Sequence, residues 1–337
     1  MLDQWFFPKR SRSFIILFVA MMVFFLNGCS KQKPKVYQVG ILCGLHVFTT
    51  TVDGFKAEMT KLGYVEGKNI VYDVHWTNFD AEAEKRILQK FVADRVDMML
   101  VMPSEVSVAA KAVTQGTKIP VVFCQTNIEG TNLIKSVEEP GGNITGVRYP
   151  GPDLALKRFE ILHTLVPHAK HIWVPYSTNV LIVSDQLKIL RPAAAKAGVT
   201  LVEAPANNAA VLLADLERRA KAADIGIGAI LFISEPLART PAVFPKIGKF
   251  AFEHRIPIGG VLYSLKGYST VFGVATDNIA VGKLAARQAH KVLRGIPVGT
   301  IPVVSAESYF QLNYTVAQEL GLNVPEGLLR QADEIIR

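Results

Sequence analysis

Beyond residue 35, short continuous apolar runs alternate with segments in which apolar residues recur at helical spacing. Short apolar runs such as Val36–Cys43 and Val96–Met102 have the length expected of buried strands. Between such runs, apolar residues recur every three or four positions. In Asp80–Arg95, for example, Leu88 and Phe91 fall on one face and the charged residues on the other. The pattern therefore predicts strands that alternate with amphipathic helices.

These segments form two series, one after the other. In the first, strands are expected at Val36–Cys43, Asn69–His75, Val96–Met102 and Ile119–Gln125, and helices at Val52–Leu62, Asp80–Arg95 and Val106–Gln115. In the second, strands are expected at His171–Tyr176, Thr200–Ala204, Ala229–Ser234 and Ile256–Leu262, and helices at Asp153–Leu165, Val183–Ala197, Asn208–Ala222 and Pro245–His254. Such succession predicts mostly parallel sheets covered by helices. The expected fold is α/β, with two doubly wound Rossmann-like lobes facing each other.

The first thirty residues carry a different pattern. Lys9, Arg10 and Arg12 precede an unbroken apolar run, Phe14–Leu26, and small residues follow it up to Cys29. This order is that of a secretory signal peptide. Because a membrane-spanning helix needs roughly 20 apolar residues, the shorter run favours a cleaved signal peptide over residues 1–28.

The end of this segment, Leu26-Asn27-Gly28-Cys29, resembles the lipobox of bacterial lipoproteins. The resemblance implies that Cys29 is acylated and anchors the chain to a membrane. An ordinary signal peptide that happens to contain a cysteine is the alternative. Residues 29–35 are short, charged and contain Pro34, which suits a tether between a membrane surface and a domain. The chain is then exported, to the periplasm or the cell surface.

Composition adds two restrictions. Half of the 337 residues are hydrophobic and a fifth are charged, which is a globular composition, and the length favours two domains. The net charge of +8 raises the question of a nucleic-acid partner. No dense Lys/Arg cluster with interleaved aromatic residues is present, so we expect no nucleic-acid binding.

Two further cysteines, Cys43 and Cys124, each stand near the end of a predicted strand. An oxidising compartment permits a disulfide between them. Two buried free thiols are the favoured interpretation, because free cysteine is among the most buried residue types.

Ligands of open α/β sheets bind at the carboxyl ends of the strands. With two such lobes face to face, the cleft between them is the expected site. This inference locates a small-molecule ligand and does not identify it.

Several short stretches, in order along the chain, resemble the ABC transporter substrate-binding lipoproteins that include tryptophan- and tyrosine-binding components. They are Asp53-Gly54-Phe55, Leu62–Asn69, Ala109-Ala110-Lys111, Ile119–Phe123, Pro140–Val147 and the tail from Leu312 to Leu329. The resemblance implies the type I periplasmic-binding fold, whose two lobes are joined by three crossovers that act as a hinge. It divides the chain into lobe I, residues 36–149 plus about 275–305, and lobe II, residues 150–274 plus about 306–337.

The same resemblance implies a function. The chain would bind a small molecule, with an aromatic amino acid suggested by the relatives, and deliver it to an ABC permease with its ATPase. It would act as a monomer, without a cofactor and without catalysis.

Two departures from the family pattern bear on the ligand. Where many relatives have Gly-Thr, this chain has Pro103-Ser104, which keeps a hydroxyl at the start of the helix predicted over Val106–Gln115. A helix N-terminus suits a ligand anion, and Ser104 as a simple N-cap is an equal alternative. Where relatives often have Asp-Pro, this chain has Asn127-Ile128, which removes a counter-charge for a ligand amine.

The expected ligand-binding residues lie in the loops after the strands and fall into three kinds. The first kind is aromatic and would form an apolar or stacking wall. The second kind has hydroxyl or amide groups for polar contacts, and the third has carboxylates for a cationic group of the ligand. In that order they are His46, Phe48 and Tyr176; Ser104, Thr126 and Asn127; and Glu235 and Asp277. Tyr176 packed against the hinge, and helix capping by either carboxylate, are the alternatives. Capping applies above all to Asp277, which directly precedes the helix predicted over Ile279–Leu293.

Other functions leave no signature here. The chain has no phosphate-binding loop, no H-E-x-x-H, no G-x-S-x-G and no C-x-x-C. Its seven histidines lack metal-ligand spacing, so neither a metal site nor a catalytic residue is expected. A cleft enzyme remains the weaker alternative. A lipoprotein that presents solute to a membrane receptor is another, and nothing in the chain separates it from transport.

Overall fold

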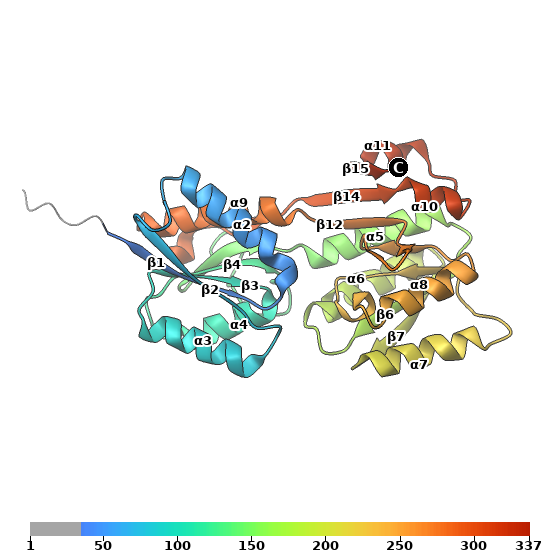
Figure 1. Ribbon diagram of the computed structural model, residues 1–337, viewed down its shortest axis with the longest axis horizontal. Helices are drawn as coiled ribbons and strands as arrows, with labels where there is room; N and C mark the ends of the chain where they lie inside the picture. The colour runs from blue at the N-terminus through green and yellow to red at the C-terminus, as the bar shows by residue number, and fades with distance from the viewer. Residues whose placement is uncertain (1–34) are drawn as a thin grey trace, which may run out of the picture.

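The computed structural model describes residues 35–337, which form two α/β lobes (Figure 1). Residues 1–28, Cys29 and the tether up to Pro34 lie outside the described residues. Among residues 35–337, no helix combines the length and the apolar character needed to cross a membrane.

Lobe I is built on a six-stranded parallel sheet in the order β13-β5-β4-β3-β1-β2. Its strands are β1 (Tyr37–Cys43), β2 (Ile70–Trp76), β3 (Met98–Met102), β4 (Val121–Thr126), β5 (Ile144–Arg148) and β13 (Val304–Ser305). Its helices are η1 (His46–Phe48), α2 (Thr49–Lys61), α3 (Ala81–Ala93), α4 (Ser104–Val113), α9 (Asn278–Leu293) and η3 (Val298–Thr300).

Side chains of β3 alternate between the two faces of this sheet. Met98, Leu100 and Met102 pack in a core cluster with α2 and α9, whereas Met99 and Val101 pack in a second cluster with α3 and α4. The strand is buried on both faces, which explains why its sequence is continuously apolar.

Lobe II has a seven-stranded sheet in the order β15-β14-β12-β9-β8-β6-β7, in which only the β12–β14 pair is antiparallel. Its strands are β6 (His171–Ser177), β7 (Thr200–Ala206), β8 (Ala229–Leu231), β9 (Ile258–Gly260), β12 (Phe272–Thr276), β14 (Ser308–Asn313) and β15 (Glu334–Ile336). A separate hairpin joins β10 (Ser264–Leu265) to β11 (Tyr268–Ser269).

The helices of lobe II cover both faces of its sheet. They are α5 (Gly151–Leu165), α6 (Ile182–Lys196), α7 (Ala209–Ala220), η2 (Leu237–Arg239), α8 (Phe244–Glu253), α10 (Tyr314–Glu319) and α11 (Glu326–Gln331). The core cluster on one face contains residues of α5, α6, α10 and α11, and the cluster on the other face contains residues of α7 and α8.

Three segments connect the lobes. The chain passes from lobe I to lobe II between β5 and α5, returns to lobe I between β12 and α9, and passes to lobe II again between β13 and β14. Figure 1 shows β12 and β14 running side by side toward lobe I. The prediction of two Rossmann-like lobes joined by a hinge is confirmed.

The start of α5 differs from the sequence-based prediction. The helix was expected to start at Asp153, but it begins at Gly151 with Pro152 in its first turn. Proline fits there because the first N–H groups of a helix have no partner within it. The Asp153 carboxylate instead pairs with the Arg148 guanidinium at 3.0 Å.

Cys43 and Cys124 are free and buried, as favoured from the sequence. They lie on β1 and β4, and β3 runs between those strands. Two strand spacings amount to roughly 10 Å, more than the Cα separation that a disulfide tolerates. Burial raises the pKa of the Cys43 thiol to about 11 and that of Cys124 well above its ordinary value.

Candidate functional site

A cavity of about 620 Å³ lies between the lobes, at the carboxyl ends of strands from both sheets. Loops after β1, β2 and β3, with Gln125 of β4, contribute one wall, and the region after β8 and β9, together with α5, contributes the other. The volume is in the range of small-molecule sites. The cleft expected from the strand order is therefore present and hollow.

The lobe I wall carries three aromatic rings. His46 and Phe48 come from η1, and Phe79 comes from the loop after β2. The His46 ring stacks on the Trp76 ring, with centroids 5.5 Å apart and planes 6° from parallel. This stacking orients one of the two aromatic residues that were predicted for this wall.

Ser104 lies at the first position of α4 and lines the cavity. It does not cap the helix, since no side-chain cap bond is formed there. Its Oγ accepts a hydrogen bond from the backbone N–H of Asn127 at 2.9 Å. Glu105, the next residue, adds a partly exposed carboxylate to the same wall. The helix N-terminus at the cavity, expected from the sequence, is thus observed.

Gln125 connects the lobe I wall to a connection between the lobes. Its backbone has a φ of 50°, an uncommon conformation for a residue other than glycine. Its side-chain amide donates to the Asn278 Oδ1 at 2.7 Å, and its Oε1 accepts from the Thr276 hydroxyl at 3.3 Å. Both partners border the passage from β12 to α9, so the side chain holds this passage against β4.

The lobe II wall contains a buried arginine. Arg158, on α5, is 1% exposed and donates to the Val274 carbonyl through Nε at 2.8 Å and through Nη2. Nη1 donates to the Ser234 Oγ at 2.6 Å, and Nη2 also donates to the Tyr149 hydroxyl at 3.2 Å. The two hydroxyls are themselves hydrogen-bonded at 2.7 Å. One side chain therefore joins α5 to two of the connections between the lobes.

Glu235 is also buried on this wall. Its carboxylate accepts from the backbone N–H groups of Ser177, Leu237 and Ala238 at 2.8–3.1 Å. Two of these donors begin η2, so the capping alternative holds for this residue. Burial raises the pKa of Glu235, and the three backbone donors offset part of the rise.

A second guanidinium stands beside Glu235. Arg239 lines the cavity and donates through Nε and Nη2 to the Glu235 backbone carbonyl, not to its carboxylate. Desolvation lowers the pKa of Arg239, and the nearby charge of Arg158 lowers it further, while Glu235 acts in the opposite direction. Arg158, Glu235 and Arg239 therefore form a buried group of charged side chains on the lobe II wall of the cleft.

Four of the predicted residues line the cavity, and four do not. His46, Phe48, Ser104 and Glu235 are on its walls. The prediction that Thr126, Asn127, Tyr176 and Asp277 line it is corrected by the structure.

The reason differs among these four. Thr126 is fully buried, and its hydroxyl is bonded to the Ser107 hydroxyl and the Cys124 carbonyl. Asn127 is 1% exposed beneath Ser104. Each is carried below the surface by the buried end of β4.

Asp277 follows the capping alternative that the sequence left open, whereas Tyr176 neither lines the cavity nor packs against the hinge. Tyr176 packs in the lobe II core, and its hydroxyl donates to Glu203 at 2.9 Å. This bond and burial raise the pKa of Tyr176 to about 12. Asp277 caps α9 by accepting from the N–H groups of Ile279 and Ala280.

Four further residues line the cavity and were not predicted from the sequence: Phe79, Tyr149, Arg158 and Arg239. Arg158 left a signal, because it shares the apolar face of α5 with Ala155, Phe159 and Leu162. A charged residue at a core position of an amphipathic helix indicates a buried polar role. The sequence around Phe79, Tyr149 and Arg239 gives no comparable indication.

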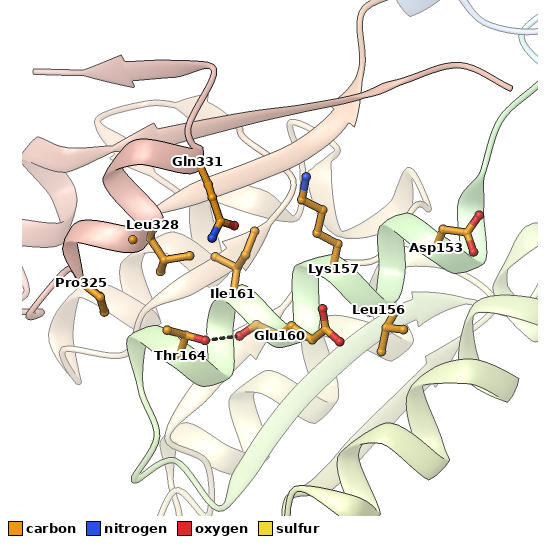
Figure 2. A pocket seen from close by; sticks show the side chains of 10 residues that line it. Asp153, Leu156, Lys157, Glu160, Ile161, Thr164, Pro325, Leu328 and Gln331 are labelled. Atoms are coloured by element: carbon orange, nitrogen blue, oxygen red, sulfur yellow. Dashed lines mark hydrogen bonds between the residues drawn. The ribbon is translucent and has the colours of Figure 1, made fainter.

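A second hollow lies within lobe II alone. Figure 2 shows it between α5 and α11, with Lys157, Glu160 and Gln331 around it. Lys157 Nζ donates to the Ser308 Oγ at 3.1 Å, so α5 presents Arg158 to the cleft and its neighbour to this outer groove. Because it touches one lobe only, a ligand there would not bridge the two. Over residues 35–337, no group of three or more potential ligands gathers that could hold a metal ion.

Comparison with known proteins decides the family. The family model described as ABC transporter substrate binding protein matches residues 46–336. The chain belongs to this family. Family membership assigns the chain to solute binding and not to catalysis, and substrate-binding proteins of ABC transporters work outside the cytoplasm.

Individual relatives agree with this assignment. A tyrosine-binding protein of Clostridioides difficile (strain R20291) is 29% identical over 321 residues, which cover 88% of this chain and 89% of the relative. An ABC domain from Streptococcus pneumonia, solved in complex with L-Trp, superposes with a TM-score of 0.76 at 21% identity, over 90% of this chain and all of that one. The ligand-free, open form of a substrate binding protein with adhesive properties from Clostridium difficile gives a TM-score of 0.69 at 22% identity, over 89% and 99% of the two chains. The two solved structures support the fold.

Proposed function

We propose that this protein is a lipid-anchored, extracytoplasmic binding protein that captures an aromatic amino acid in its cleft and delivers it to an ABC importer. The observation that carries the proposal is that one cavity combines aromatic rings with charged and hydroxyl groups. An aromatic ring fits against His46, Phe48 and Phe79 of lobe I, and the polar end of an amino acid fits against the charged and hydroxyl groups of lobe II.

The relatives favour this ligand class. One is a tyrosine-binding protein, and another was solved with L-Trp. Both ligands join an aromatic ring to a zwitterionic end, which is the combination that the two walls offer. Tyr263 adds a further aromatic surface at the cavity, where Phe244 holds it in an edge-to-face contact with ring centroids 4.8 Å apart.

Capture would follow from closure of the lobes. The three connections between β5 and α5, β12 and α9, and β13 and β14 allow the lobes to move against each other. A ligand that contacts both walls stabilises the closed state by its additional contacts there. Glu105 of lobe I already reaches the backbone N–H of Leu181 in lobe II at 3.4 Å, which marks the rim where closure occurs.

Thermal unfolding of the soluble chain from Ser30 tests the ligand class, with amino acids, nucleobases, sugars and organic acids added one at a time. Bound ligand is first removed by unfolding and refolding. A ligand at about 100 times its dissociation constant adds roughly 2.7 kcal/mol to the free energy of unfolding. We expect a shift of several degrees with L-tyrosine or L-tryptophan and none with glycine. A shift confined to sugars or nucleobases would contradict the proposal.

The anchor is tested separately in cells. Cys29→Ala should release the protein from the membrane fraction and abolish incorporation of a clickable palmitate analogue. Cys43→Ala, which changes a cysteine inside lobe I, is the matched control and should leave both unchanged. Labelling that survives the Cys29 substitution would exclude the lipid anchor.

A further inference from the structure

The Arg158 guanidinium has no negative partner in the protein. Its hydrogen bonds all go to neutral oxygens, those of Val274, Ser234 and Tyr149. Over the described residues no carboxylate lies within ion-pair distance of it, although it is 1% exposed. A buried charge without a counter-charge is costly, so its retention at a cavity calls for a partner that comes from outside.

The hydroxyls of Ser234 and Tyr149 line the cavity together with Arg158. Each oxygen accepts one N–H of Arg158, and one hydroxyl donates to the other. A hydroxyl has a single proton to donate. The two hydroxyls together have two protons, and one of these forms the hydrogen bond between them. The other O–H is left free to donate to a group in the cavity.

We infer that Ser234 and Tyr149, held by the buried Arg158, form the receptor for a ligand carboxylate and make the cleft selective for carboxylate anions over their neutral counterparts. The inference rests on the proposed function and narrows its ligand chemistry. The carboxylate accepts the free O–H, and the guanidinium that donates to both hydroxyls supplies the counter-charge beside it.

The remaining charges of the cavity agree with this orientation. Arg239 adds a second positive charge to the lobe II wall, and Glu235 is already engaged by three backbone N–H groups. On the opposite wall, the carboxylate of Glu105 offers a partner for a ligand ammonium group. A zwitterion is thus oriented with its carboxylate toward lobe II.

The receptor also touches the hinge. Tyr149 belongs to the connection between β5 and α5, and Val274, the other partner of Arg158, belongs to β12 just before the connection to α9. A carboxylate bound here contacts the point from which the lobes rotate.

Calorimetric titration of the refolded soluble chain with paired ligands tests the inference. The pairs are L-tyrosine with L-tyrosinamide, L-tryptophan with L-tryptophanamide, and non-aromatic organic acids with their primary amides. Each acid that binds should bind about 10- to 100-fold more tightly than its amide, since a hydrogen bond to a charged group is lost. An amide that binds as tightly as its acid would overturn the inference, and so would a panel in which no carboxylate binds. If only non-aromatic acids bind, the proposed ligand class fails and the receptor stands.

Three variants locate the selectivity. Tyr149→Phe and Ser234→Ala each remove one hydroxyl and keep Arg158, and both should bring the acid-to-amide affinity ratio toward one. A purely structural role would weaken acid and amide equally and leave the ratio unchanged, which would refute the assignment. Tyr309→Phe, on β14 outside the cavity, is the matched control and should retain the ratio. Circular dichroism confirms folding, and because these changes leave the buried guanidinium in place, both variants should fold.

Discussion

The pKa values of two carboxylates of lobe II are shifted in opposite directions, according to what holds each of them. Glu235 is held by backbone N–H groups, and burial raises its pKa. Glu203, on β7, is held by the Arg191 guanidinium at 2.8 Å, which lowers its pKa. Their opposite shifts make the two carboxylates a matched pair for titration experiments.

For Glu235→Gln, the pH dependence of stability is the informative quantity. Because the folded-state pKa is raised, the stability linked to the neutral carboxyl is present in full below the ordinary glutamate value and is lost as pH rises through the raised value. Gln cannot titrate, so we expect the stability advantage of the native protein over this variant to grow as pH falls through that window. Urea unfolding of both proteins at a series of pH values measures this difference in the free energy of unfolding.

Glu203→Gln should give the opposite sign. Its folded-state pKa is lowered, so the stability linked to the charged form is present above the ordinary value and is lost as pH falls through the lowered value. The advantage of the native protein over this variant should then shrink on acidification. Equal slopes for the two variants would contradict the assigned environments.

Thiol reactivity checks the interior of lobe I. Only the thiolate is nucleophilic, and burial keeps Cys43 and Cys124 protonated near neutral pH. Ellman's reagent at pH 8 should find no reactive thiol in the folded soluble chain and two after unfolding in guanidinium. Rapid reaction of either cysteine before unfolding would show that this face of the sheet is open.

At the scale of elements, the contact of α2 with α9 depends on two glycines. A Cβ added at Gly54 would lie 2.4 Å from the Ile279 carbonyl oxygen, and one added at Gly282 would lie 2.1 Å from the Thr51 carbonyl oxygen. Backbone atoms cannot turn aside as a side chain can. The two helices approach closely because neither glycine presents a side chain, and α9 thereby attaches the connection from β12 to lobe I.

Gly282→Ala should therefore lower the free energy of unfolding by about 1–3 kcal/mol, the range for overpacking, or by more if the helices must separate. Gly327→Ala on α11 is the control, because an added Cβ there meets nothing within 4 Å. That substitution should be neutral or stabilise by about 0.4–1 kcal/mol. Denaturant unfolding of both variants provides the comparison, and a Gly282→Ala protein as stable as the control would show that the helices are not in close contact.

Element prediction was most successful where periodicity was continuous. The runs that became β1, β3 and β4 are mostly buried, so their sequences are mostly apolar. β5, β12 and the strands after α9 were not predicted, because short strands at connections and edges carry too few residues for a period to show. The start of α5 was predicted at Asp153, two residues after its true start at Gly151.

At the scale of the whole molecule, ligand binding should change the separation of the lobes. If L-tyrosine or L-tryptophan contacts both walls, saturating ligand should reduce the radius of gyration measured by small-angle scattering. Glycine, which lacks the aromatic ring, is the matched control and should leave the scattering curve unchanged. Binding without compaction would show that the ligand rests on one lobe and does not close the cleft.

The sequence by itself determined the α/β class, the two series of strands and helices, and the region of the cleft. These follow from local periodicity and from the rule that sites lie at the carboxyl ends of parallel strands. It also placed Ser104 and Glu235 at the cavity.

Tertiary structure alone decided which strand-end residues reach the cavity and which helix contributes to it. Thr126 and Asn127 are buried at the end of β4, whereas Arg158 reaches the cavity from the middle of α5, 116 positions before its partner Val274 in the sequence. Local sequence reports the period of an element, but the direction of a side chain depends on how elements distant in the chain pack together. A buried charge and the hydroxyls that surround it are therefore assembled only by the fold.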